Sequence, residues 1–168
     1  LYVIGGTSMK TGAVNSIEKI SFKVESTARH GILDGKNWPG FRGDGSSLTL
    51  AKNLPSKWQD SDIKWSKKLE GYGQSSPVVF DDKVYITDVI GEKKEKLGVH
   101  CYDLKTGKKN WSKFFNNKNL QKVSQYISKG SSTPCVDTYG VYCFFETGLL
   151  VAISHEGNVF WKRYPLAN

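Results

Sequence analysis

The chain has 168 residues and a formal net charge of +8. This length allows one or two domains, and no apolar stretch approaches the roughly 20 residues of a membrane-spanning helix. Three cysteines, an odd number, exclude a complete disulfide framework, so we expect free, buried thiols, with a Cys135–Cys143 disulfide as the alternative.

The positive charge comes mostly from lysines, which cluster around 93–96, 108–109 and 118–122. Lysine-rich loops can contact phosphates or acidic surfaces. No arginine-rich run and no known nucleic-acid-binding module accompanies these lysines. We therefore expect them to solubilise loops and discourage pairing of sheet edges, and we expect no nucleic-acid partner.

The first 25 residues differ from the rest. An apolar segment ending in a double glycine (1–6) is followed by a polar loop and a second predicted strand (14–24). This order resembles the middle of a kelch blade. The resemblance implies that residues 1–25 are the end of a preceding propeller or a strand pair that closes a ring.

Residues 26–62 are predicted to be a connection, because they are rich in glycine and show little periodicity. A domain boundary is expected there. Residues 63–69 then form a predicted strand that contains Trp65.

The remaining chain contains two similar units, 71–115 and 129–164. Pro77 and Pro134 lie 57 residues apart, and a tryptophan follows each unit's predicted third turn. A repeat of about 50 residues built from short strands predicts an all-β fold, a β-propeller of four-stranded antiparallel blades. Two blades cannot close a ring that needs about 4–8, so the chain is expected to be a fragment. The predicted strands are 74–80, 83–89, 98–104 and 109–115, then 130–136, 141–146, 149–155 and 159–164, with a possible short helix over 120–127.

The segment CYDLKTGKKNW (101–111) carries the most specific pattern. Asp103 and Thr106 can satisfy the backbone donors of a turn, Gly107 permits its positive φ, and Trp111 can cover the gap to the next blade. The segment resembles the tryptophan-docking repeat of pyrroloquinoline quinone (PQQ)-like propellers, with Cys101 in place of an alanine.

The copy AISHEGNVFW (152–161) departs from that pattern. Ser154 replaces the aspartate, Glu156 replaces the threonine, and one residue fewer precedes Gly157. The resemblance gives Trp161, like Trp65, a docking role.

The lead-in NWPGFRGDG (37–45), with 54–58 and 63–79, is similar to bacterial PQQ-like repeat proteins, which are related in fold to the outer-membrane assembly lipoprotein of the β-barrel machinery. This resemblance implies that strand 63–69 is the outermost strand of the last blade. It also implies a non-catalytic binding or scaffolding module in the periplasm or on the surface of a bacterium. A third interpretation is the junction of two propellers in a cell-surface or carbohydrate-active protein.

The same family implies a competing function, a PQQ-dependent quinoprotein oxidoreductase with calcium beside the quinone. Adjacent cysteines and a carboxylate cluster, which that chemistry uses, are missing from the sequence. The catalytic residues would then lie outside this chain, so we predict no catalytic residue and no cofactor here. The three histidines (30, 100 and 155) lack partners at ligand spacing, so we expect core or loop histidines and no metal site.

Two groups of residues are candidate ligand contacts. Tyr72, Gln74 and Ser75 lead into an innermost strand and would lie near one mouth of the channel. Arg42 and Asp44 follow two aromatic residues of the connection and would offer charged contacts. The alternative is that the aromatic residues pack the connection onto the propeller and Arg42 pairs with a carboxylate. Expected partners are other blades of the same or an associated chain, and a protein or carbohydrate.

Overall fold

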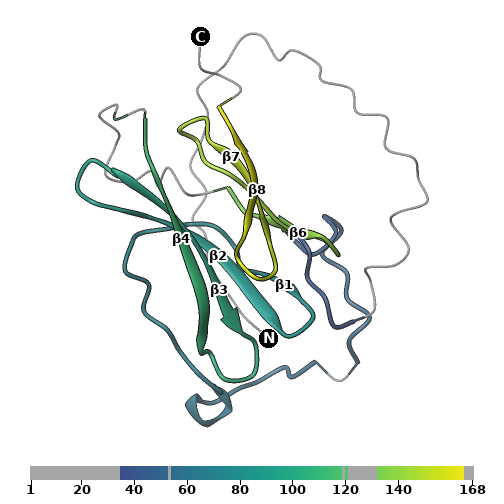
Figure 1. Ribbon diagram of the computed structural model, residues 1–168. Helices are drawn as coiled ribbons and strands as arrows, with labels where there is room; N and C mark the ends of the chain where they lie inside the picture. Colours follow the sequence, from purple (N-terminus) through teal and green to yellow (C-terminus); the bar gives the residue numbers. More distant parts are fainter. Residues whose placement is uncertain (1–34, 53, 119, 121–131, 165–168) are drawn as a thin grey trace, which may run out of the picture.

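The computed structural model describes residues 35–52, 54–118, 120 and 132–164. The kelch-like segment (1–25) and most of the candidate helix (120–127) lie outside them. The described residues form two four-stranded antiparallel sheets and one short 3-10 turn, η2 (Asp60–Asp62) (Figure 1). The predicted all-β class with four-stranded antiparallel blades is therefore confirmed. No helix in this part of the chain is long and apolar enough to cross a membrane.

The first sheet has the strand order β1-β2-β3-β4. Its first hairpin closes tightly, because Phe80 pairs with Lys83 and leaves only two residues for the turn. Asp81 adopts φ 50 there, a left-handed conformation that aspartate tolerates better than most residues. The strands are β1 (Val78–Phe80), β2 (Lys83–Ile90), β3 (Lys96–Asp103) and β4 (Lys109–Asn116).

The second sheet repeats this order as β5-β6-β7-β8. It packs face to face against the first sheet, and buried apolar side chains of both sheets form one core cluster. This arrangement is that of two successive propeller blades. The strands are β5 (Cys135–Val136), β6 (Gly140–Phe144), β7 (Leu150–Ser154) and β8 (Val159–Arg163).

The register of the hairpin between β5 and β6 determines whether Cys135 and Cys143 lie on the same face of the sheet. Cys135 pairs with Tyr142, so Cys143 points to the opposite face, and the three cysteines are free. Cys101 and Cys143 are buried, as expected, but Cys135 is exposed. The expectation that all three thiols are buried was therefore wrong for Cys135, because β5 presents this side chain to the face that points away from β1–β4.

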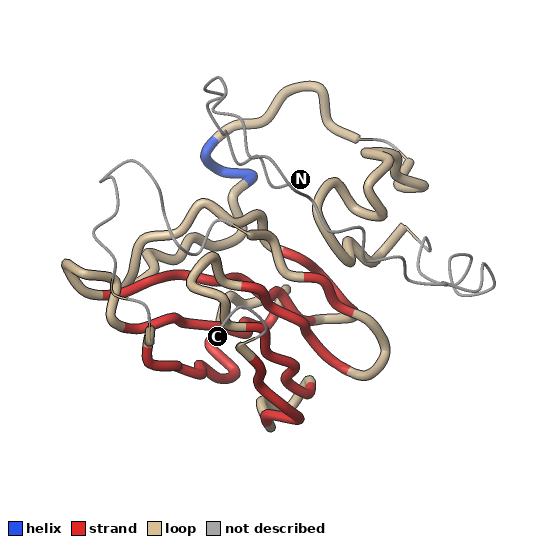
Figure 2. Tube along the Cα trace, turned by 90° about the horizontal axis from the view of Figure 1, so that it is seen from above, coloured by secondary structure: helices blue, strands red, loops and turns tan. Residues whose placement is uncertain are grey.

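The connection reaches the innermost edge of both sheets. Trp38 exchanges two backbone hydrogen bonds of 2.8 Å with Val79 of β1, and the carbonyl of Pro39 accepts one of 2.8 Å from Val136 of β5. The segment around Trp38 therefore ties the two blades together. Most of the remaining connection, with η2 in blue, lies apart from the red strands in Figure 2.

Two strand predictions differ from the structure. Residues 63–69 are not assigned to a strand, and no sheet pairing in the described part of the chain includes them. A strand needs a neighbour with which to hydrogen-bond, and this segment has none in the described part of the chain. The innermost strands are also shorter than predicted, because β1 begins at Val78 and β5 at Cys135.

Candidate functional site

The turn after β3 is held by one carboxylate. Asp103 Oδ1 accepts hydrogen bonds from the backbone N–H of Lys105 (3.1 Å) and from the N–H (2.7 Å) and hydroxyl (2.6 Å) of Thr106. These bonds lower the pKa of Asp103, with the Thr106 hydroxyl contributing most. Gly107 completes the turn at φ 67.

A tryptophan lies against this turn, and another lies against its counterpart in the second sheet. Trp65 Nε1 donates to the carbonyl of Leu104 at 2.8 Å, and Trp111 Nε1 donates to the carbonyl of His155 at 2.9 Å. Each indole covers a glycine, since a Cβ on Gly107 would lie 2.5 Å from the Trp65 ring and one on Gly157 would lie 2.9 Å from the Trp111 ring. The two tryptophans therefore make the same contact at successive positions.

Polar groups in the interface between the sheets satisfy one another. The Tyr85 hydroxyl lies 2.6 Å from His155 Nδ1, and His155 Nε2 donates to the carbonyl of Asp137 at 3.0 Å. Burial raises the pKa of Tyr85 far above its ordinary value, so its hydroxyl is the donor to the histidine. The ring of Phe80 stacks on His155 with centroids 5.2 Å apart. His155 is thus a structural interface residue.

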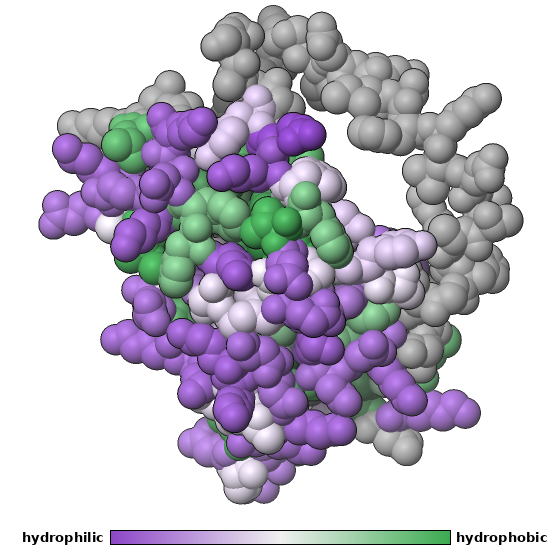
Figure 3. Space-filling view, viewed as in Figure 1, coloured by the Kyte–Doolittle hydropathy of each residue, from purple (hydrophilic) through white to green (hydrophobic). Residues whose placement is uncertain are grey.

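Trp161 has no such contact among the described residues. It pairs across the strands with Ala152 as Trp111 does with Cys101, yet it is 36% exposed. Its neighbours Val159 and Phe160 are also exposed. Figure 3 shows an apolar strip amid hydrophilic surface in the region where β4 and β8 run.

The residues of the first predicted group of ligand contacts differ in their exposure to solvent. Tyr72 and Gln74 are exposed, and the Lys94 ammonium lies 5.6 Å from the centre of the Tyr72 ring. Ser75 is buried, and its hydroxyl contacts the Thr87 side chain at 2.9 Å. Ser75 is therefore a poor candidate for contact with a ligand, because its backbone turns the side chain into the sheet.

The second group stays on the connection. Arg42 donates from Nε to the Ser47 hydroxyl, and among the described residues it makes no ion pair with the carboxylate that was expected as its partner. Asp44 Oδ1 accepts from the Ser46 backbone at 2.9 Å. Phe41 is 63% exposed instead of packed.

A buried polar network crosses β2, β3 and β4 on the other face of the first sheet, away from β5–β8. His100 Nε2 contacts Asp88 Oδ1 at 2.8 Å, and His100 Nδ1 contacts the Ser112 hydroxyl at 2.8 Å. Asp88 also accepts the backbone N–H of Gly71 at 2.9 Å. Gly98 leaves room for this network, because a Cβ there would lie 2.1 Å from Asp88 Oδ1.

The network places carboxylate, imidazole and hydroxyl in series, but its chemistry is structural. Asp88 and His100 are almost completely buried, and both ring nitrogens are engaged. Mutual hydrogen bonding is what buried polar groups require. Sequence reasoning missed this network, because Gly98 was predicted to begin its strand, whereas it lies inside β3, where a glycine indicates a close approach. The described residues contain no group of three or more His, Cys, Asp or Glu side chains that could hold a metal ion.

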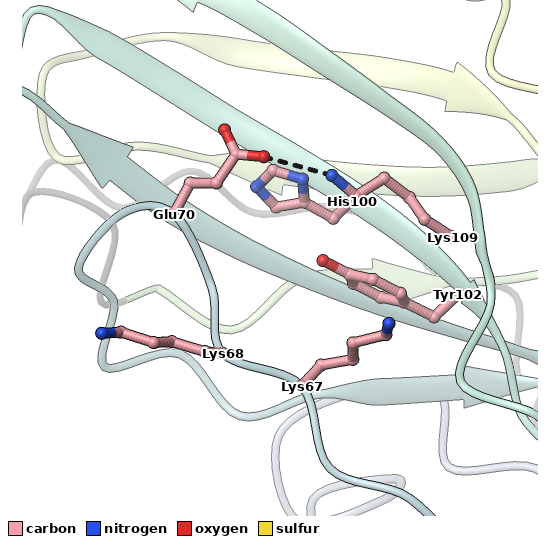
Figure 4. A pocket seen from close by; sticks show the side chains of 6 residues that line it. All are labelled: Lys67, Lys68, Glu70, His100, Tyr102 and Lys109. Carbon is pink, nitrogen blue, oxygen red and sulfur yellow. Dashed lines mark hydrogen bonds and ion pairs between the residues drawn. The ribbon is translucent and has the colours of Figure 1, made fainter.

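A small pocket opens beside His100. Its volume is about 160 Å³, and it lies between the segment after Trp65 and the strands β3 and β4 (Figure 4). Lys109 Nζ is 3.3 Å from Glu70 Oε1 across it. Sequence reasoning missed this pocket too, because its residues come from separate segments. The lining residues are Lys67, Lys68, Glu70, His100, Tyr102 and Lys109.

No protein-family model matches the chain, and no curated protein matches it. Among solved structures, a quinohemoprotein alcohol dehydrogenase from Pseudomonas putida is similar at 20% sequence identity, with a TM-score of 0.36. The similarity covers 52% of this chain and 12% of that protein.

Proposed function

We propose that the chain is a non-catalytic binding or scaffolding module of a larger propeller protein, of the PQQ-like repeat class and located outside the bacterial cytoplasm. The observation that carries this proposal is the outward face of the β5–β8 sheet, which no described segment of the chain covers with a further sheet. Trp161 stands there in the position that Trp111 occupies in the first sheet, but no second turn covers it among the described residues.

The first sheet indicates what would cover that face. Tyr142 on β6 corresponds to Tyr85 on β2, 57 positions earlier, and Cys135 corresponds in the same way to Val78. In the first sheet Tyr85 and Val78 are fully buried by the second sheet. The same positions of the second sheet fit another four-stranded blade whose turn receives the Trp161 indole.

The polar groups of the described residues support a non-catalytic role. His155 and Tyr85 hold the interface, Asp103 holds its turn, and His100 with Asp88 forms a closed pair inside the sheet. Catalytic acids and bases need to reach a reacting group within hydrogen-bonding distance. These side chains instead form their hydrogen bonds with other groups of the protein.

Cys135 supplies the test, because it lies on the open face beside Tyr142. A maleimide should label Cys135 quickly in the 168-residue chain and slowly in the whole native protein, where another blade covers it. Cys101 and Cys143 are internal controls that stay unlabelled until the protein is unfolded, since both are buried. Equal labelling of Cys135 in both proteins would contradict the scaffold proposal.

The competing quinoprotein function has its own readout. The whole native protein is incubated with PQQ and calcium and then passed through gel filtration. The non-catalytic proposal expects no quinone absorbance in the protein peak. Quinone absorbance in the protein peak would contradict the non-catalytic proposal and would indicate a quinoprotein oxidoreductase instead.

A further inference from the structure

We propose that the pocket beside β3 binds a small oxyanion group, held by the hydroxyl of Tyr102 and the ammonium groups of Lys67 and Lys109. The group is a carboxylate, sulfate or phosphate, either free or at the end of a larger ligand. This site lies on the opposite face of the first sheet from the second blade. It therefore goes beyond the scaffolding role and can exist whether or not that role is correct.

Tyr102 is the central donor. The residue is only 5% exposed and lines the pocket, and its hydroxyl has no hydrogen-bond partner among the described residues. The hydroxyl is the accessible end of a side chain that is otherwise buried, so it can donate a hydrogen bond to a ligand oxygen in the pocket. Burial raises the pKa of Tyr102 above its ordinary value, so the hydroxyl keeps the proton that it donates. Figure 4 shows this hydroxyl pointing into the pocket.

The charges around the hydroxyl favour an anion. Lys67 reaches toward the ring of Tyr102, whereas the ammonium of Lys68 points away (Figure 4). Lys109 is paired with Glu70 at 3.3 Å, and both side chains are substantially exposed. Exposed ion pairs contribute little free energy, so an entering oxyanion can replace the Glu70 carboxylate beside Lys109.

The back wall limits the size of the ligand. His100 stands in the wall with both ring nitrogens already engaged by Asp88 and Ser112, so it shapes the pocket without donating to the ligand. The volume of about 160 Å³ is well below the roughly 300–1,000 Å³ of sites for drug-sized molecules. The pocket therefore suits a single charged group instead of a whole organic cofactor.

The test is a titration of the full chain, followed by NMR, with phosphate, sulfate, acetate and glucuronate at constant ionic strength. We expect saturable binding of at least one anion. Y102F keeps the ring and removes the donor, so the dissociation constant should rise about tenfold, the size of one hydrogen bond to a charged group. K67Q should also weaken binding, and added salt should weaken it further.

Substitution of Glu70 is expected to strengthen anion binding, in contrast to the substitutions of Tyr102 and Lys67. E70Q removes the competing carboxylate from Lys109, so binding should tighten several-fold. K64Q and E92Q are charge-matched controls at exposed residues outside the pocket, and their affinities should stay within about twofold of the wild type. Unfolding curves of every variant establish that it is folded.

The outcomes separate the sources of the anion. Tighter binding of glucuronate than acetate indicates an acidic sugar, while tighter binding of phosphate or sulfate indicates a tetrahedral oxyanion. The proposal is overturned by absent saturable binding to all four anions, by wild-type affinity in Y102F and K67Q, or by weaker binding in E70Q. None of these results bears on the labelling of Cys135, so the scaffold proposal is judged separately.

Discussion

Trp111 and Trp161 occupy equivalent places in two similar sheets, but their surroundings differ. Trp111 donates to the carbonyl of His155 and covers Gly157, whereas Trp161 is 36% exposed with no corresponding turn in the described part of the chain. The repeat thus determines where an indole stands on its strand. The neighbouring sheet determines whether that indole stabilises anything.

The same contrast extends over the two outer strands. β4 has four half-buried residues, including Trp111 and Phe115, which pack against the shared core. Every residue of β8 is exposed. The faces differ in burial far more than in sequence, since a large aromatic residue is present on both strands. Removing corresponding side chains therefore measures the contribution of the neighbour directly.

The largest expected effect comes from the tryptophans. Trp111→Ala should lower the free energy of unfolding by about 3 kcal/mol, the lower end for removing a packed tryptophan. Trp161→Ala should lower it by no more than about 0.5 kcal/mol, as expected for a surface substitution. Urea unfolding of both variants and the wild type gives the two values.

The two tryptophan variants can also contradict the proposed difference between the two sheets. Equal losses for the two variants would mean that Trp161 is packed in solution, by another copy or by another segment. Unfolding of the wild type at several protein concentrations then separates these cases, because packing by another copy makes the unfolding midpoint depend on protein concentration.

The next largest expected effect separates the stability contributed by the contact between Gly157 and the Trp111 ring from the cost of the turn conformation at Gly157. Gly157→Ala would place a Cβ 2.9 Å from the Trp111 ring, at a residue with φ 90. Gly45 has a similar φ of 94, but a Cβ there would meet nothing within 4 Å. Both substitutions carry the cost of alanine at positive φ, so Gly157→Ala should cost about 1–2 kcal/mol more, from overpacking alone.

Gly45→Ala is therefore the matched control, measured by the same urea unfolding. Similar losses at the two glycines would show that the Trp111 ring gives way to a methyl group. The docking contact would then be looser than its hydrogen bond to His155 suggests.

The sequence allowed the blade architecture to be predicted because it depends on regular features. Short apolar strands separated by turns repeat at a similar spacing, and in both units a glycine precedes the tryptophan by four residues, as Gly107 precedes Trp111 and Gly157 precedes Trp161. Such patterns are local, so they can be read without coordinates. Strand ends were harder, because β1 and β5 extend only as far as a neighbour pairs with them.

The pocket and the polar network could not be predicted in the same way. Asp88, His100 and Ser112 meet only because the register of three strands brings them together. The pocket adds Lys67, from an extended segment with no regular pairing in the described part of the chain. A one-residue change of register would separate these side chains while leaving the sequence pattern intact.

The smallest expected effect concerns acid stability and compares the two docking turns. The pKa of Asp103 is lowered chiefly by the Thr106 hydroxyl, and the pKa of Glu156 is lowered chiefly by a hydrogen bond from Ser154. A carboxylate whose folded-state pKa is lowered stabilises the protein above its unfolded-state pKa, and this stabilisation disappears as pH falls through the folded-state value. Both contributions are therefore present at neutral pH and are lost below about pH 4.

Asp103→Asn and Glu156→Gln should each reduce stability at about pH 7, and the difference between each variant and the wild type should shrink as the pH is lowered to about 3. The Asp103 variant should lose more, because its carboxylate accepts three hydrogen bonds at the turn that receives Trp65. Urea unfolding at the two pH values gives the differences, with Glu92→Gln as an exposed control. A difference between Asp103→Asn and the wild type that persists at low pH would mean that the asparagine disturbs the turn itself, independently of the charge.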